Sequence, residues 1–201
     1  MFQFPKEPRK IKERISRYER ELRKEYKKFG FISDGYGKRY LLGPLYLILG
    51  DLPRAIRSFE WFEHTFPGDI GEPFHCLCWT LALYRSGNMT GASLKLRQTM
   101  LSNLYLIPHL LGLAQDKLNI WHGSNLAEKD YLQYTPPEIW ALWDEPALRW
   151  AKETYESPEF CRIRARYIEI YEQLGSEPPG PKRSQLVSEA FGLATMGKDQ
   201  R

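Results

Sequence analysis

The sequence predicts an all-α protein, and three observations support this prediction. Apolar residues recur three or four positions apart in most segments, glycines followed by capping residues separate these segments, and no stretch alternates apolar and polar residues as a strand does. The chain has 201 residues, of which 42% are hydrophobic and 27% charged, enough for a sizeable core in a globular protein. We expect one compact domain with a basic element at 1–35, helical repeats at 36–117 and capping helices at 118–201.

The first helix is predicted at residues 9–29. Its apolar residues fall at helical spacing and form one stripe on an otherwise charged helix, and Gly30 suits the C-terminal cap. The stripe consists of Ile11, Ile15, Tyr18, Leu22, Tyr26 and Phe29. We expect it to pack on the rest of the protein, with a turn at 33–37 leading to the next helix.

Positive charge is concentrated in this first helix. Residues 6–28 hold eleven Lys or Arg and five acids, a net charge of +6, whereas the whole chain carries +4. The candidate basic face comprises Arg9, Lys12, Arg17, Arg20, Arg23, Lys24 and Lys27. This face could bind phosphates in a salt-dependent way or lie on anionic lipid. Alternatively, ion pairs such as Glu13–Arg17 and Glu21–Lys24 could leave it a solvated face.

Two glycine joints predict the next helices. Gly50 can end one helix in the left-handed conformation, and Asp51 can cap the following helix, which should run to about Thr65. Gly87-Asn88 repeats the arrangement between helices at 73–86 and 89–101. A further apolar helix is expected over roughly 105–117, followed by a break at 122–125.

Proline and capping residues divide the remainder into helices. Thr135-Pro136-Pro137-Glu138 predicts a capping box with proline in the first turn. Pro146 should separate a short helix from a longer one, and Ser157-Pro158 should cap a helix that ends at Gly175. We expect a linker at 176–184, a last short helix that opens at Ser184, and fraying at 197–201.

The spacing of small and aromatic residues in 41–67 resembles the tetratricopeptide repeat, a roughly 34-residue helix pair that stacks on its neighbours. The repeat-defining residues are Leu42, Gly43, Tyr46, Gly50, Ala55, Phe59, Pro67, Gly87 and Ala92. The resemblance implies that Gly43 and Ala55 lie where the paired helices touch, with Tyr46 and Phe59 as packing rings. A second unit follows around Gly87, and a third is indicated only by Leu111-Gly112.

The same resemblance implies a concave groove on the first helix of each pair. The candidate groove residues are Tyr40, Leu47, Phe74, Leu77, Leu81, Tyr84, Arg85, His109 and Lys117. Most are apolar, so the groove must be covered. We expect residues beyond about 135 to fold over it; the alternative is a helix from another chain, including a second copy of this one. The rings of Trp140, Trp143, Trp150 and Tyr155 would belong to the core or to an interaction hot spot.

No motif in the sequence indicates a reaction, a cofactor or a metal. His75-Cys76-x-Cys78 cannot form a tetrahedral metal site without a second pair of ligands, and core packing is the simpler interpretation. The segment 121–125, "WHGSN", predicts a capped turn rather than a catalytic triad. Nucleotide-binding, hydrolase and metalloprotease motifs do not occur.

Composition favours a cytoplasmic protein. Three cysteines are too few for a disulfide framework, the N-terminus lacks the apolar core of a signal peptide, and the most apolar stretch, 104–113, is too short to cross a bilayer. The sequence thus predicts a non-enzymatic protein-interaction scaffold or adaptor that binds a peptide, a helix or a second copy of itself. The alternative is a nucleic-acid-associated protein that uses helix 9–29, with weak and non-specific binding at most.

Overall fold

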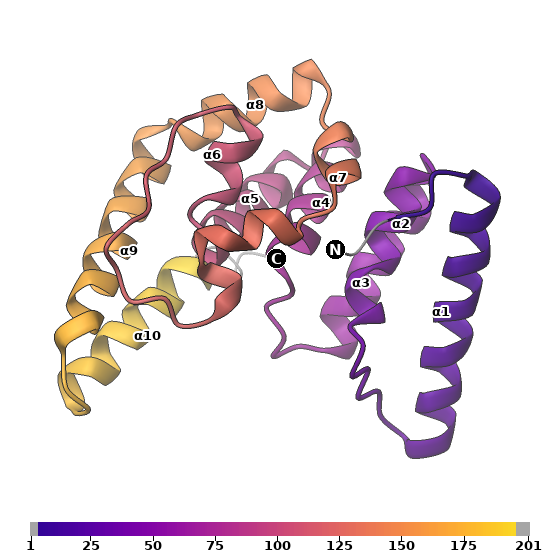
Figure 1. The fold of residues 1–201 in the computed structure, drawn as a ribbon, viewed down its shortest axis with the longest axis horizontal. Coiled ribbons are helices and arrows are strands. Elements are labelled where there is room, and N and C mark those ends of the chain that lie inside the picture. Colours follow the sequence, from indigo (N-terminus) through magenta and orange to yellow (C-terminus); the bar gives the residue numbers. More distant parts are fainter. Residues whose placement is uncertain (1–3, 196–201) are drawn as a thin grey trace. The chain divides into compact units, whose positions relative to one another are not determined.

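All regular structure in residues 4–195, which the computed structural model describes, is helical (Figure 1). Helix accounts for 71% of these described residues, and no strand occurs among them, which confirms the all-α prediction. The helices, with three short 3₁₀ helices labelled η, are α1 Pro8–Phe29, η1 Lys38–Tyr40, α2 Leu42–Ile48, α3 Leu52–Thr65, α4 Pro73–Arg85, α5 Met89–Ser102, α6 Leu106–Leu110, η2 Asn125–Ala127, η3 Lys129–Tyr134, α7 Pro137–Ala141, α8 Glu145–Tyr155, α9 Pro158–Ser176 and α10 Pro181–Thr195.

The chain forms two compact units. The first unit contains the residues up to 92 together with 135–143, and the second contains 93–134 and the described residues from 144 onward. The basic helix α1, expected as a separate element up to residue 35, lies in the first unit beside α2 and η1. The short helix α7 also belongs to the first unit and contacts α2, although it follows α2 by some ninety residues.

Helix α1 has the predicted position but only part of its apolar stripe is covered. Ile11, Ile15 and Leu22 are buried. Gly30 adopts φ +75° and donates its backbone N–H to the carbonyl of Tyr26, as a left-handed C-cap does. The prediction that the whole stripe packs on the protein is wrong, because Tyr26 and Phe29 at its C-terminal end are more than half exposed.

The joint at Gly50-Asp51 is confirmed. Gly50 has φ +74°, and the Asp51 carboxylate accepts the backbone N–H of Arg54 at 3.1 Å, which caps α3. Helices α2 and α3 pack closely, because a Cβ added to Gly43 would lie 2.4 Å from the ring of Phe59. Ala55 and Phe59 are both fully buried on α3.

The joint at Gly87-Asn88 follows the same design. Gly87 has φ +81°, and the Asn88 side chain accepts the N–H of Gly91 at 2.9 Å to cap α5. The helix before this joint, α4, is buried from Pro73 to Leu83 without a solvent-facing stripe. A helix apolar on every side forms the interior of its unit.

The expected helix over 105–117 is wrong in length. Helix α6 ends at Leu110, because Gly112 takes φ +66° and the N–H of Leu113 turns back to the carbonyl of Pro108. The predicted break at 122–125 overlaps a non-helical segment at 113–124, and Asn125 begins η2. The third helix pair is therefore not completed here.

Two further helix starts differ from expectation. Helix α7 has Pro136 at its N-cap, and the Thr135 hydroxyl caps nothing and has no hydrogen-bond partner among the described residues. Helix α10 begins at Pro181, three residues before Ser184, because Pro181 suits the first turn and the Ser184 N–H bonds to Gly180. The positions at Pro146 and Ser157 are as predicted, and residues 197–201 lie outside the described range.

In the second unit, α9 and α10 pack through a small apolar cluster of Ile170, Leu174, Leu186 and Ala190. Of the four rings predicted as core or hot spot, Trp143 and Tyr155 are buried, and Trp140 and Trp150 are partly exposed. None of the helices within residues 4–195 combines the length and apolar character that crossing a bilayer requires.

Candidate binding surface

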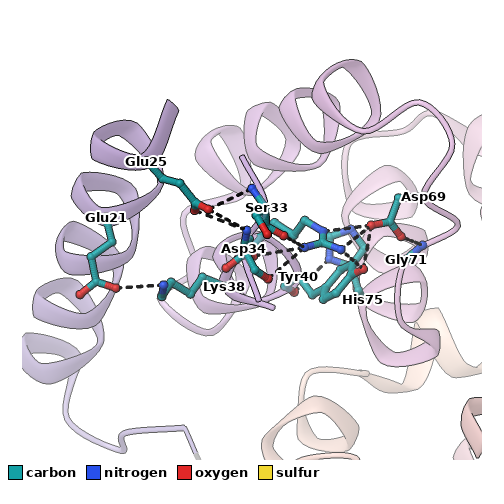
Figure 2. Close-up of polar contacts among 10 residues, drawn as sticks. Glu21, Glu25, Ser33, Asp34, Lys38, Tyr40, Asp69, Gly71 and His75 are labelled. Carbon is teal, nitrogen blue, oxygen red and sulfur yellow. Dashed lines mark hydrogen bonds and ion pairs between the residues drawn. The ribbon is translucent and has the colours of Figure 1, made fainter. Parts of the chain in front are cut away.

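A cluster of polar side chains in the first unit links the segment between α1 and α2 to neighbouring elements. The Glu25 carboxylate on α1 accepts the backbone N–H of Ser33 at 3.0 Å and that of Asp34 at 3.3 Å (Figure 2). Lys38 lies 3.3 Å from Glu21, one turn earlier on the same helix. These contacts hold residues 31–40 against α1.

Arg39 ties this segment to the loop before α4. Its Nε donates to Asp69 at 2.9 Å, and the hydroxyl of Tyr40 donates to the same carboxylate at 2.7 Å. Burial alone would raise the pKa of Asp69, but the hydrogen bonds from Tyr40, the Gly71 N–H and Arg39 hold that pKa below its usual value. Asp69 is therefore a structural anion that two loops share.

His75 on α4 also contacts the segment between α1 and α2. Its Nδ1 lies 2.9 Å from the carbonyl oxygen of Tyr40, and because a carbonyl only accepts, Nδ1 carries the proton. The ring contacts those of Phe59, Phe62 and Trp79. This histidine is surrounded by aromatic side chains and positions the backbone; it does not face the cavity described next.

A cavity of about 740 Å³ lies in the first unit between α1 and α3. Its lining combines cationic, aromatic and aliphatic side chains. The lining residues are Glu19, Leu22, Arg23, Tyr26, Ile32, Leu42, Tyr46, Arg54, Arg57, Ser58, Trp61, His64 and Thr65. We call this space the α1–α3 cavity.

The α1–α3 cavity carries an excess of positive charge. Arg23 and Arg57 form no ion pair with any described residue, and Arg54 lies 3.5 Å from Asp51 outside the lining. The one acid in the lining, Glu19, accepts a hydrogen bond from the Tyr46 hydroxyl at 2.5 Å. Burial, followed by this bond to the carboxylate, raises the pKa of Tyr46.

One hydroxyl in the cavity is left without a partner. The Ser58 Oγ is shielded from water and has no hydrogen-bond partner within residues 4–195. A shielded hydroxyl that makes no hydrogen bond is unfavourable. The Ser58 Oγ is therefore an unsatisfied polar atom beneath the surface of the cavity.

Four exposed aromatic side chains follow the cavity along the end of α1 and the next loop. These four form what we call the aromatic edge: Tyr26 (57% exposed), Phe29 (53%), Phe31 (62%) and Tyr36 (88%). Lysines accompany them, with the Lys28 ammonium 4.7 Å from the Phe29 ring centre and the Lys38 ammonium 5.2 Å from that of Tyr36. Tyr26 also lines the α1–α3 cavity, so the two features are continuous.

The predicted basic face is only partly neutralised, and by other partners than expected. Glu13 pairs with Arg9 at 2.9 Å instead of Arg17, and Glu21 lies 4.0 Å from Arg17 and 3.3 Å from Lys38 instead of pairing with Lys24. The remaining members have no ion pair with a described residue; they are Lys12, Arg20, Arg23, Lys24 and Lys27.

The candidate groove residues do not form an open surface. Leu47, Phe74, Leu77 and Leu81 are buried. Helix α7 contacts α2, and its Ile139 is fully buried in the same unit. Of the segment predicted to fold over the first helices, only residues 135–143 belong to this unit, and the described residues from 144 onward belong to the second unit.

The other groove candidates have separate surroundings. Tyr40 belongs to the polar cluster, Tyr84 is partly exposed, and the Arg85 guanidinium donates to the Leu142 carbonyl at 2.6 Å. His109 and Lys117 are exposed on the second unit.

The remaining candidate residues are buried or hydrogen-bonded within their own unit. Cys76 and Cys78 are buried, and burial raises the pKa of the Cys78 thiol. In the second unit, His122 lies between the Tyr105 hydroxyl at 3.3 Å and Glu128 at 3.6 Å, and Tyr105 accepts the N–H of Leu118. Across residues 4–195, no group of three or more His, Cys, Asp or Glu side chains is placed to hold a metal ion.

Comparisons with protein-family models, curated proteins and solved structures give no match for this chain. The tetratricopeptide-like arrangement therefore stays a prediction.

Sequence reasoning missed the α3 side of the cavity. The lining residues on that helix recur at helical spacing, namely Arg54, Arg57, Ser58, Trp61, His64 and Thr65. They lie on another side of α3 from Ala55 and Phe59, which pack in the core. A second periodic stripe, basic and aromatic, was the signal in the sequence that could have indicated this surface.

Proposed function

We propose that the chain is a non-enzymatic protein-interaction scaffold built on tetratricopeptide-like helix pairs, with the aromatic edge as its docking surface. The observation that carries the proposal is the exposure of four aromatic side chains between residues 26 and 36. Exposed aromatic groups of this kind are typical of interaction sites. The apolar stripe of α1 is buried as far as Leu22 and exposed at Tyr26 and Phe29, where it joins the aromatic edge. A partner that packs on this edge would bury the exposed end of the stripe.

The helix-pair part of the proposal is supported by two joints of the same design. Gly50 and Gly87 both take positive φ, and a capping side chain follows each of them. The close approach at Gly43 supports the first pair in particular, since small residues at such contacts characterise the repeat.

The surroundings of the aromatic edge favour an acidic partner. Lys24 precedes the edge on α1 and Lys27 lies between Tyr26 and Phe29, both without an ion pair to a described residue, and Lys28 lies over Phe29. A second copy of the chain would bring another helix of net charge +6 to the same place, which like-charge repulsion opposes. The edge therefore suits an acidic segment of a different protein.

The test compares two variants with matched exposure. The double variant Phe31→Ser and Tyr36→Ser removes half of the edge, and Phe191→Ser removes an equally exposed ring (63%) from α10 in the second unit. Proteins captured from the source cells by the intact chain are identified, purified and titrated against each variant by calorimetry. We expect the double variant to weaken binding by about 2 kcal/mol or more, as for a hot spot, and Phe191→Ser to bind normally.

Three results would contradict this proposal. The first is a purified partner that binds the double variant as tightly as the intact chain. The second is self-association of the chain that the double variant abolishes, which would make the edge a dimer interface. The third is capture of nucleic acid in place of protein, with the captured material released by nuclease.

A further inference from the structure

We infer that the α1–α3 cavity is an anchor pocket that takes a large aromatic or apolar side chain from an acidic peptide segment, whose carboxylates bind the arginines of the lining. The inference rests on the proposed function, because it specifies the chemistry of the partner next to the aromatic edge. Three properties of the cavity lead to it: its size, its apolar surfaces and its unbalanced charge.

The size suits a side chain with adjoining backbone. A volume of about 740 Å³ lies within the range of pockets that enclose a ligand, roughly 300–1,000 Å³. A single bound ion would leave most of this space empty. Peptide recognition commonly uses one large side chain as an anchor in such a pocket.

The apolar surfaces provide the contact for an anchor. Leu22 and Leu42 are buried residues that line the cavity, and Trp61, Tyr26 and Tyr46 contribute rings. Aromatic pairs gain stability beyond the area that they bury, so an aromatic anchor is favoured over an aliphatic one.

The charge selects an acidic segment. Arg23, Arg54 and Arg57 come from two helices and converge on one cavity in which Glu19 is the only acid and is bonded to Tyr46. Guanidinium groups bind carboxylates through paired hydrogen bonds, a geometry that lysine cannot supply. Arg23 and Arg57 have no carboxylate partner in the described part of the chain, so both are available for a ligand.

A peptide fits the lining better than single-stranded nucleic acid does. Arginine binds guanine edges and phosphates as well as carboxylates, so the charge of the lining does not separate the two kinds of ligand. Single-strand binders track the backbone along a groove of successive stacking rings, whereas this site is one cavity. Nucleic acid is therefore the competing outcome of the test.

The probe is a fluorescein-labelled, acetylated and amidated peptide with one tryptophan between pairs of glutamates. Two control peptides replace either the tryptophan with serine or the glutamates with glutamine. Fluorescence anisotropy with the full chain should show saturable binding of the probe, and each control peptide should bind at least about tenfold more weakly. This result would show that both the tryptophan and the glutamates of the probe are needed for its full affinity.

Two protein variants locate the site. Arg57→Glu reverses an exposed, unpaired charge in the cavity, and Lys12→Glu makes the same charge change on the solvent face of α1, away from the cavity. We expect Arg57→Glu to weaken the probe about tenfold or more and Lys12→Glu to have little effect. In nitrogen-15 spectra, the indole signal of Trp61, identified by its loss in Trp61→Phe, should shift on saturation with the probe.

Equal binding of the probe to Arg57→Glu and to the intact chain would overturn the inference, as would a Trp61 signal that does not move. Displacement of the probe by an oligodeoxythymidylate at lower concentration than by unlabelled peptide would also overturn it. These failures are distinct from failure of the proposed function. The aromatic-edge variants can still lose their protein partner when the cavity does not bind the probe.

Discussion

The side chain of Phe59 occupies the space that any side chain at Gly43 would need. An added Cβ at this position would lie 2.4 Å from one ring carbon and 2.5 Å from the next, closer than non-bonded carbons approach. The contact joins α2 to α3, and Phe59 in turn stacks on Trp79 of α4 with ring centres 5.4 Å apart. One glycine thereby sets the spacing of three helices.

We predict that Gly43→Ala destabilises the first unit by about 1–3 kcal/mol, the usual cost of overpacking a core. The cost arises because the Phe59 ring, which is fully buried, must shift to admit the added Cβ. Urea unfolding with hydrogen-exchange readout on α3 measures the change. Gly68→Ala is the matched control, since nothing lies within 4 Å of an added Cβ there. An unchanged stability for Gly43→Ala would mean that α2 and α3 are not in contact at this point.

Local signals explain which elements could be predicted. Gly50, Asp51, Gly87 and Asn88 determine helix ends through their own backbone and side-chain preferences, so the sequence suffices. Gly112 carries the same helix-ending signal, whereas the resemblance to a third repeat treats Leu111-Gly112 as a position inside a helix. The glycine signal predicts the end of α6 correctly, and the repeat pattern predicts a helix that is too long.

The candidate surface could not be predicted in the same way. The α1–α3 cavity exists because Leu22 and Trp61, nearly forty residues apart, face one space after folding. The stripe on α1 predicted burial of Tyr26 and Phe29, but periodicity does not indicate how far along a helix the neighbouring elements extend. Which residues at the end of the stripe are exposed can be determined only when the positions of the neighbouring helices and loops are known.

Ile139 on α7 should contribute to the first unit although it lies far from that unit in sequence. We predict that Ile139→Ala costs about 2–5 kcal/mol, because the side chain is fully buried and its removal leaves a cavity. Loss of protection in α2, measured by hydrogen exchange, should accompany the change, since α7 contacts α2. The exposed neighbour Ala141 provides the control through Ala141→Ser. Destabilisation confined to α8 and α9 would place α7 with the second unit.

Asp69 should make the first unit sensitive to acid. Its pKa is lower in the folded protein than the usual value of about 3.9, so the folded state binds fewer protons and its contribution is present above that value. As the pH falls through the lower, folded pKa, this contribution is lost. We therefore expect Asp69→Asn to be less stable than the intact chain at neutral pH and to lose less stability on acidification.

Urea unfolding at neutral pH and between about pH 5 and pH 2 tests this prediction. Asn has one oxygen where the carboxylate has two, so it cannot accept from both the Tyr40 hydroxyl and the Gly71 N–H as Asp69 does, and it also lacks the charge that faces Arg39. The control is Glu60→Gln, an exposed carboxylate on α3 with no ion pair to a described residue. A pH profile of Asp69→Asn parallel to that of the intact chain would show that this anion does not contribute to acid sensitivity.

The basic face of α1 should bind nucleic acid weakly and without sequence preference. Five of its cations have no ion pair with a described residue, and contacts of lysine and arginine with phosphate carry no sequence information. If all five contact phosphates of a single strand, the logarithm of the binding constant should fall with the logarithm of salt concentration at a slope of about −3.5. Anisotropy titrations of an oligodeoxythymidylate and a mixed-sequence strand across a salt series measure the slope.

Lys12→Glu, in which one contact becomes a repulsion, should reduce both the affinity and the slope. Tight binding of one sequence at physiological salt, with little dependence on ionic strength, would contradict this prediction and indicate that the face reads nucleic acid specifically.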